Sequence, residues 1–207
     1  MTSSSRLAGL LLFVGAGEFL TGMIVAESVF PNYSVSKNYI SDLGAYCPTL
    51  STCQIEPSAP IFNGSAIFFG ILILLSSFLL WQAYKSKVFT PIVALAGIGV
   101  LGVGLFPETT GIWHPIFSFI AFFFAGASAI TAYKIEKAPY SYLSVIAGVV
   151  TLIALGLYIE GQYLGLGPGG MERMVAYPAL IFTLGFGGHF MAGIPPKGQY
   201  QTPVTSK

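Results

Sequence analysis

Residues 61–81 read IFNGSAIFFGILILLSSFLLW and contain no charged side chain. A helix needs about 20 predominantly apolar residues to cross the hydrocarbon core of a bilayer, so this run predicts a transmembrane helix. Five more runs are similarly apolar, and we expect their boundaries to hold to about three residues. The six predicted spans are 7–29, 61–81, 89–106, 115–133, 142–159 and 175–194.

The composition of the whole chain differs from that of a water-soluble domain. Of its 207 residues, 54% are hydrophobic and 8% are charged, whereas soluble domains carry about 25% charged residues. The mean hydropathy of +0.76 agrees with this comparison. We therefore predict an all-α, polytopic membrane protein, in which residues 1–207 form a single domain, a bundle of six transmembrane helices. The net charge of +1 and the lack of a basic stripe argue against nucleic acid as a partner.

The charged residues sort to opposite sides of the predicted spans. Seven of the nine basic residues fall on one side and six of the eight acidic residues on the other. Cytoplasmic segments of membrane proteins collect Lys and Arg, so we expect a plasma-membrane protein with both termini, and a short tail at 195–207, in the cytoplasm. The basic set is Arg6, Lys85, Lys87, Lys134, Lys137, Lys197 and Lys207; the acidic set is Glu27, Asp42, Glu56, Glu108, Glu160 and Glu172.

The predicted outer loop at 30–60 contains both cysteines of the chain, Cys47 and Cys53. Disulfides persist on the oxidising side of a membrane, so we predict a Cys47–Cys53 disulfide that contributes about 2 kcal/mol. Two free thiols are the alternative. The loop also contains a sequon that begins at Asn32, which predicts N-glycosylation if the host glycosylates.

Glu18 lies near the middle of the first predicted span. An ionised carboxylate at this depth is costly and usually faces a cavity or a partner. Glu18 is therefore either a functional site, for a proton or a polar head group, or a protonated acid bonded to a neighbouring helix. His189, near the end of the last span, is expected to bond another helix rather than a ligand. Four glycines of the third span predict close helix packing; they are Gly97, Gly99, Gly102 and Gly104.

The outer ends of the spans carry a second set of polar candidates. There His114, with Asp42 or Glu172 as its carboxylate partner, could perform general acid–base chemistry near neutral pH. Arg173 could anchor a phosphate. The alternative is that these residues are ordinary interfacial polar groups and helix caps. The two histidines of the chain differ widely in depth, which argues against a multi-histidine metal site, and we predict neither a metal nor a cofactor.

Several short segments resemble the signature of a membrane family known as domain of unknown function 998, best represented in archaea. The matching segments are YSVSKNYISDLG at 33–44, IFN at 61–63, Phe106-Pro107 followed by His114, and Glu172-Arg173 followed by Tyr177-Pro178. This family has no established activity, but the resemblance singles out five residues for testing. They are Asp42, Asn63, His114, Glu172 and Arg173.

The box ISDLG at 40–44 is also similar to the ISDTG box of the Frag1/DRAM/Sfk1 membrane proteins, with Leu43 in place of their threonine. Those proteins also have six helices, and some of them remodel or organise lipids. The similarity implies a lipid theme and no specific reaction.

These observations lead us to expect an integral membrane protein that binds lipids or serves as an accessory subunit of a larger membrane complex. The first alternative is a membrane enzyme that acts on a lipid head group at the outer leaflet through His114, Asp42 and Arg173. The second is a small proton-coupled transporter that uses Glu18. The sequence leaves open whether the protein is an enzyme. The predicted ligand-binding residues are Arg173, Asn63 and Glu18, and we expect the outer loop to pair Asp42 with Arg173 or His114.

Overall fold

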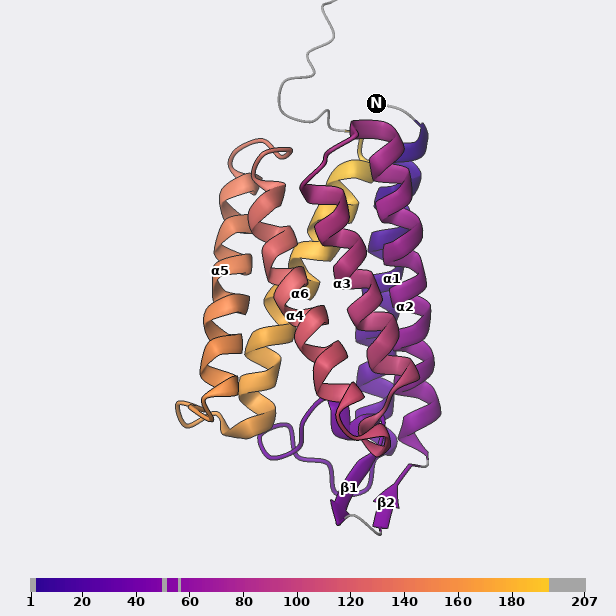
Figure 1. Cartoon of the computed structure of the whole chain (residues 1–207), viewed down its shortest axis with the longest axis vertical. Helices are drawn as coiled ribbons and strands as arrows, with labels where there is room; N and C mark the ends of the chain where they lie inside the picture. Colours follow the sequence, from indigo (N-terminus) through magenta and orange to yellow (C-terminus); the bar gives the residue numbers. More distant parts are fainter. Residues whose placement is uncertain (1–2, 50–51, 56, 194–207) are drawn as a thin grey trace, which may run out of the picture.

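The computed structural model describes residues 3–49, 52–55 and 57–193 (Figure 1). Glu56 and the predicted tail at 195–207, with Lys197 and Lys207, lie outside the described residues. Six long helices form the body of the molecule: α1 (Ser3–Val29), α2 (Ser58–Tyr84), α3 (Phe89–Leu105), α4 (Trp113–Ala132), α5 (Tyr140–Ile159) and α6 (Gly167–Met191). Short elements complete the fold: the 3-10 turns η1 (Ser41–Leu43) and η2 (Glu108–Thr110), and the strands β1 (Tyr46–Thr49) and β2 (Thr52–Gln54).

The predicted all-α class is confirmed, apart from the small two-stranded hairpin. Five of the helices are long and apolar enough to cross a membrane, and the sixth, α3, is apolar but has 17 residues. The largest boundary difference is at α6, which begins at Gly167 instead of residue 175. Hydropathy marks the apolar part of a helix, whereas the first turns of α6 contain glycine, proline and two charged residues. Proline fits there because the first helical turn needs no backbone N–H.

The helices form a closed arrangement. Each helix packs against the next one in the chain, and α6 packs against α1. Helix α4 also contacts α6 directly, and α5 packs on the outside of these two helices. Helix α5 therefore lies at the edge of the bundle (Figure 1). The remaining five helices surround the interior.

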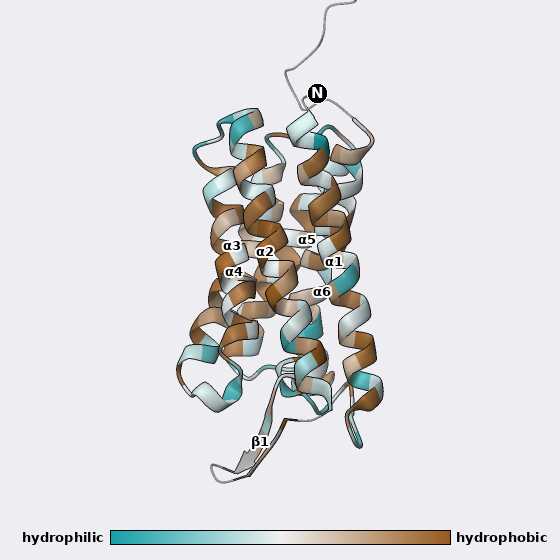
Figure 2. Cartoon of the chain, turned by 90° about the vertical axis from the view of Figure 1, so that its right-hand side faces the viewer, coloured by the Kyte–Doolittle hydropathy of each residue, from teal (hydrophilic) through white to brown (hydrophobic). Residues whose placement is uncertain are grey.

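Consecutive helices run in opposite directions, so the connections fall at two ends of the bundle (Figure 1). One end, here called the hairpin end, carries the α1–α2, α3–α4 and α5–α6 connections. The opposite end carries the start of α1, the α2–α3 and α4–α5 connections and the end of α6. Hydrophobic residues line the middle of the bundle, and hydrophilic residues gather mainly toward its ends (Figure 2). The described members of the basic set therefore lie at the end opposite the described members of the acidic set.

Close helix contacts depend on glycine at defined positions. A Cβ atom on Gly99 of α3 would lie 2.2 Å from the backbone nitrogen of Ala121 in α4. A Cβ atom on Gly9 of α1 would lie 2.6 Å from the carbonyl oxygen of Gly187 in α6. The prediction that glycines of the third span allow close packing is confirmed.

The hairpin end carries a disulfide between Cys47 of β1 and Cys53 of β2, with an S–S distance of 2.10 Å. The two strands pair in antiparallel fashion. The predicted disulfide is thus present and links the two strands of the hairpin.

All six long helices expose large apolar side chains. Examples with more than two fifths of their surface exposed, one from each helix, are Ile24, Phe78, Ile98, Phe119, Ile153 and Ile181, at 62%, 59%, 43%, 47%, 60% and 66%. Soluble monomers rarely expose apolar surface on this scale. The outer surface of the bundle therefore suits contact with lipid chains.

Candidate functional site

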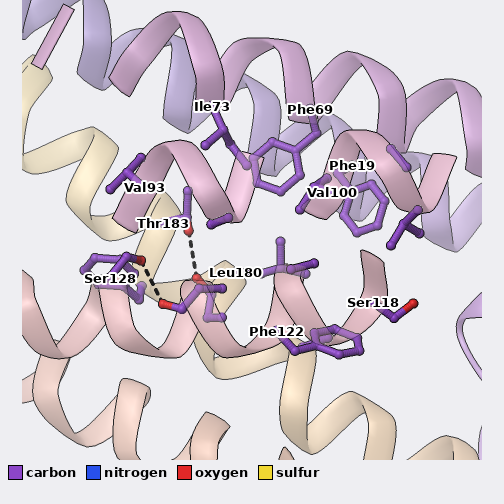
Figure 3. Close-up of a pocket in the computed structure, with 18 of the residues that line it drawn as sticks. Phe19, Phe69, Ile73, Val93, Val100, Ser118, Phe122, Ser128, Leu180 and Thr183 are labelled. Atoms are coloured by element: carbon purple, nitrogen blue, oxygen red, sulfur yellow. Dashed lines mark hydrogen bonds between the residues drawn. The ribbon is translucent and has the colours of Figure 1, made fainter. Parts of the chain in front are cut away.

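A narrow apolar cavity of about 110 Å³ lies inside the bundle (Figure 3). Side chains from α1, α2, α3, α4 and α6 line it, and among them are Phe19, Phe69 and Phe122. On α6 the lining runs from Glu172 to Phe186, which is about 21 Å at 1.5 Å per residue. The cavity therefore extends along much of the bundle axis.

The polar groups of the cavity wall are few. Ser128 and Thr183 lie along its length, and their hydroxyls donate to the carbonyl oxygens of Ala125 and Ala179 in their own helices (Figure 3). These bonds leave the middle of the wall effectively apolar. The other polar residues that line the cavity, Ser41, Ser118 and Glu172, lie toward the hairpin end.

The segment 40–44, which includes η1, closes the cavity at the hairpin end. Ile40 and Ser41 line the cavity, and Leu43 is fully buried in a cluster that includes Phe62 of α2. The carbonyl oxygen of Gly44 accepts a hydrogen bond of 3.0 Å from the Asn63 side chain of α2. Each of these contacts holds the segment against the helix ends.

Glu172 is the buried carboxylate of the cavity. It is 3% exposed, and its Oε2 atom accepts a hydrogen bond from the backbone N–H of Ile40. Within the described part of the chain, no hydrogen bond reaches its Oε1 atom. Nearby, the Ser41 hydroxyl donates to Oε1 of Glu108 over 2.9 Å. The hairpin end of the cavity is therefore rich in acceptor oxygens.

Arg173, the next residue of α6, holds the α1–α2 connection in place. Its Nη2 atom donates to Glu27 of α1 at 2.5 Å and to the Tyr33 hydroxyl at 2.6 Å. Its Nη1 atom donates to three backbone carbonyl oxygens, those of Val35, Asn38 and Gly169. Both Nη atoms are thus occupied by structural contacts, whereas the buried Nε atom has no hydrogen-bond partner among the described residues. Arg173 does not line the cavity.

Asp42 makes different contacts from those predicted. Its Oδ2 atom accepts hydrogen bonds from the Asn38 side chain at 2.8 Å and from the Tyr39 backbone at 3.0 Å. The predicted pairing of Asp42 with Arg173 or His114 is therefore wrong, because Glu27 pairs with the arginine and Asp42 bonds within its own loop. Burial raises the pKa of Asp42, and the bonds from Asn38 and Tyr39 lower it in part.

His114, at the start of α4, is 7% exposed and bonded on both ring nitrogens. Its Nδ1 atom lies 2.8 Å from the carbonyl oxygen of Phe106, and its Nε2 atom lies 3.3 Å from the Ser118 hydroxyl. A carbonyl oxygen can only accept, so in the neutral ring Nδ1 carries the proton and Nε2 accepts from Ser118. Neither nitrogen bonds a described carboxylate, so the predicted acid–base pair is not assembled.

The remaining predicted residues have other surroundings. Glu18 accepts a hydrogen bond of 2.7 Å from Ser65 of α2 and lines neither cavity described for this chain. The His189 ring stacks on the Tyr140 ring, with centroids 5.6 Å apart. Asn32 is exposed in a turn at the hairpin end, and its glycosylation stays a prediction.

Sequence reasoning gave no role to Ser41 or Glu108, although both belong to the site. Glu108 lines a second, open pocket of about 460 Å³ together with Lys37, Tyr39 and Asp42. The Ser41–Glu108 hydrogen bond therefore lies between this pocket and the inner cavity. Burial and, to a smaller extent, the charge of Asp42 raise the pKa of Glu108 to about 7, although the bond from Ser41 acts to lower it. The position of Ser41 within the ISDLG box was the signal available in the sequence.

The fold and the site define a multi-pass helical membrane protein with an internal apolar cavity. Residues 13–189 match the family described as "Protein of unknown function (DUF998)", so the chain belongs to this family and the predicted membership is confirmed. No curated protein and no solved structure matches the chain. The similarity to Frag1/DRAM/Sfk1 proteins stays a prediction.

Proposed function

We propose that this protein binds one lipid-like molecule, with a single apolar chain, in the cavity between its helices. The observation that carries the proposal is the cavity itself, which is narrow, apolar along its length and polar toward the hairpin end. Ligand sites in proteins are typically apolar cavities in which a few polar groups fix the orientation. A chain would lie along the bundle axis, with its head group beside Glu172 and Ser41.

A copurification experiment tests this proposal with two matched alanines of α4. Ala125 lines the cavity, whereas Ala127 does not. The Ala125→Leu variant should fill part of the cavity and lose at least about 90% of the bound lipid, and Ala127→Leu should retain it. Mass spectrometry of the intact protein, extracted in mild detergent, measures the lipid per chain. Equal lipid occupancy in wild type and Ala125→Leu, with both variants folded, would contradict the proposal.

We further propose that all six helices span the membrane, with both termini cytoplasmic and the hairpin end outside. The positive-inside rule supports this orientation, because Arg6, Lys85, Lys87, Lys134 and Lys137 lie at the opposite end. Helix α3 covers about 26 Å at 1.5 Å per residue. Local thinning of the bilayer accommodates a helix a few ångströms short of the core.

The orientation is testable with an impermeant maleimide on intact cells. In a Cys47→Ser/Cys53→Ser background, Lys37→Cys at the hairpin end should react before lysis. Lys87→Cys at the opposite end should react only after the cells are lysed. Both lysines are exposed, so the pair controls for access, and the reverse pattern would overturn the orientation.

The contacts favour binding over the alternatives. Arg173 is already engaged by Glu27 and backbone carbonyls, which weakens its predicted role as a phosphate anchor for an enzyme. Glu18 lines neither cavity, which weakens the transporter hypothesis. An accessory subunit should expose apolar side chains on one helix face more than on the others. Here all six long helices expose such side chains, so none stands out as a docking face.

A further inference from the structure

The hydroxyl groups that line the inner cavity already donate their protons to other groups. Ser41 donates to Glu108, and Ser118 donates to the Nε2 atom of His114. Ser128 and Thr183 donate to helix carbonyls. A hydroxyl has one proton and two lone pairs, so toward the cavity these four groups retain acceptor capacity alone.

Glu172 adds further acceptor capacity at the same place. The Ile40 N–H bonds its Oε2 atom, which leaves the Oε1 atom without a donor from the described residues. A cationic head group favours the ionised form of the Glu172 carboxyl, and an ionised carboxylate accepts hydrogen bonds and donates none. A buried carboxylate whose second oxygen has no donor is costly unless a partner supplies one.

Cationic side chains are missing from the wall of this cavity. Its lining residues, all within the described ranges, include no Lys, Arg or His. Arg173 is adjacent in sequence, but Glu27, Tyr33 and three carbonyl oxygens occupy its Nη atoms. A phosphate or carboxylate head group would therefore meet the Glu172 carboxyl and acceptor oxygens, with no cationic side chain on the cavity wall to compensate its charge.

We propose that the cavity selects single-chain amphiphiles whose head group donates hydrogen bonds, an amine or an alcohol, and rejects those with phosphate or carboxylate heads. Glu172 is the acceptor for the head group, assisted by the Ser41 oxygen. This inference rests on the proposed function and names the class of ligand that the same site takes. An ammonium head pairs with the Glu172 carboxylate, so amines bind more tightly than alcohols.

A panel of four probes with the same chain tests the selection. The probes are hexadecylamine, hexadecanol, hexadecanoate and hexadecyl phosphate, each added to delipidated wild-type protein in mild detergent. Native mass spectrometry measures the occupancy as a function of probe concentration. The amine and the alcohol should bind at least about 10-fold more tightly than the two anions, since hydrogen bonds to charged groups are worth about 1.5–3 kcal/mol and 1.4 kcal/mol is tenfold.

Two variants assign the selection to Glu172. The Glu172→Gln variant should lose at least about 10-fold in affinity for the amine and lose the preference for amine over alcohol. The control is Glu160→Gln, an exposed residue at the same end of the bundle, which should bind all four probes as the wild type does. If Glu172→Gln does not fold, the wild-type panel still decides the question.

The outcomes separate this inference from the proposed function. Hexadecyl phosphate or hexadecanoate could instead bind tightly to the wild type and fail to bind to Ala125→Leu. That result would overturn the proposed preference for amine and alcohol head groups, but it would still support lipid binding in the cavity. An unchanged amine preference in folded Glu172→Gln would also overturn the rule. If none of the probes binds and the wild type copurifies with no lipid, both proposals fail.

Discussion

At the residue scale, the Arg173 side chain makes five hydrogen bonds to described residues at the hairpin end. It joins Glu27 of α1 to Tyr33 and the backbone of the α1–α2 connection. The Arg173→Ala variant leaves Glu27 without its partner and three carbonyl oxygens without their donor. Breaking a buried ion pair on one side costs about 3–5 kcal/mol, so the midpoint of unfolding should fall sharply.

Hydrogen exchange separates this effect from a general loss of charge. In Arg173→Ala, the amide of Gly169, which donates to Ser36, should exchange faster than in the wild type. The exposed Lys37→Ala serves as the control, because it removes a cation from the same loop without buried contacts. Wild-type stability and exchange in Arg173→Ala would refute the structural role.

Glu136, in the α4–α5 connection, is a fully buried carboxyl without hydrogen-bond partners among the described residues. Burial raises its pKa from 4.5 to about 7, even though the nearby Ser144 hydroxyl acts to lower it. As the pH rises, the unfolded chain loses this proton before the folded protein does. The contribution of Glu136 to folding stability is therefore greatest below about pH 4.5 and is lost as the pH rises to about 7.

The Glu136→Gln variant should consequently be more stable than the wild type at pH 8, by an amount on the order of 3 kcal/mol, and similar to it at pH 4.5. Denaturant unfolding in mild detergent at both pH values measures this difference. Glu108 carries a shift in the same direction, so part of the slope should remain. The exposed Glu160→Gln should behave as the wild type, and an equal gain there would contradict the explanation.

At the element scale, the contact between α3 and α4 depends on Gly99. An added Cβ atom would lie 2.2 Å from the backbone nitrogen of Ala121, so Gly99→Ala must separate two helices that line the cavity. Overpacking of this kind typically costs about 1–3 kcal/mol. In α5, a Cβ atom added to Gly156 would meet no atom within 4 Å. Gly156→Ala should therefore stabilise the helix by about 0.5–1 kcal/mol.

Thermal unfolding of the two glycine variants checks this contrast, and lipid occupancy provides a second measurement. Gly99→Ala should lower both the melting temperature and the amount of bound lipid, because the cavity wall shifts. Gly156→Ala should change neither the lipid content nor the fold. A stabilising effect of Gly99→Ala would show that α3 and α4 are farther apart than described.

Hydropathy predicted these elements well where the helix and its apolar segment coincide. The third predicted span began at Phe89, where α3 begins. The start of α6 was missed because Glu172 and Arg173 lie within the helix, and their burial depends on the loop that packs over them. Local sequence carries no information about that loop, which is distant along the chain.

At the scale of the whole molecule, sequence reasoning located the polar site but not its pairing. Asp42, Asn63, Glu172 and Arg173 lie together at the hairpin end, as topology and family resemblance predicted. The rotation of α1 and α6 about their axes decides which carboxylate pairs with Arg173. In the structure this rotation places Glu27 beside Arg173. The cavity was also beyond prediction, since it is the space that five helices leave between them.

The most direct test of the central claim is an experimental structure of the protein in nanodiscs formed from its own membrane lipids, without added ligand. We predict elongated density inside the bundle, along Phe69 and Leu180, with one end beside Glu172 and Ser41. An interior that is empty or filled by side chains, with lipid density confined to the outer surface, would contradict the account.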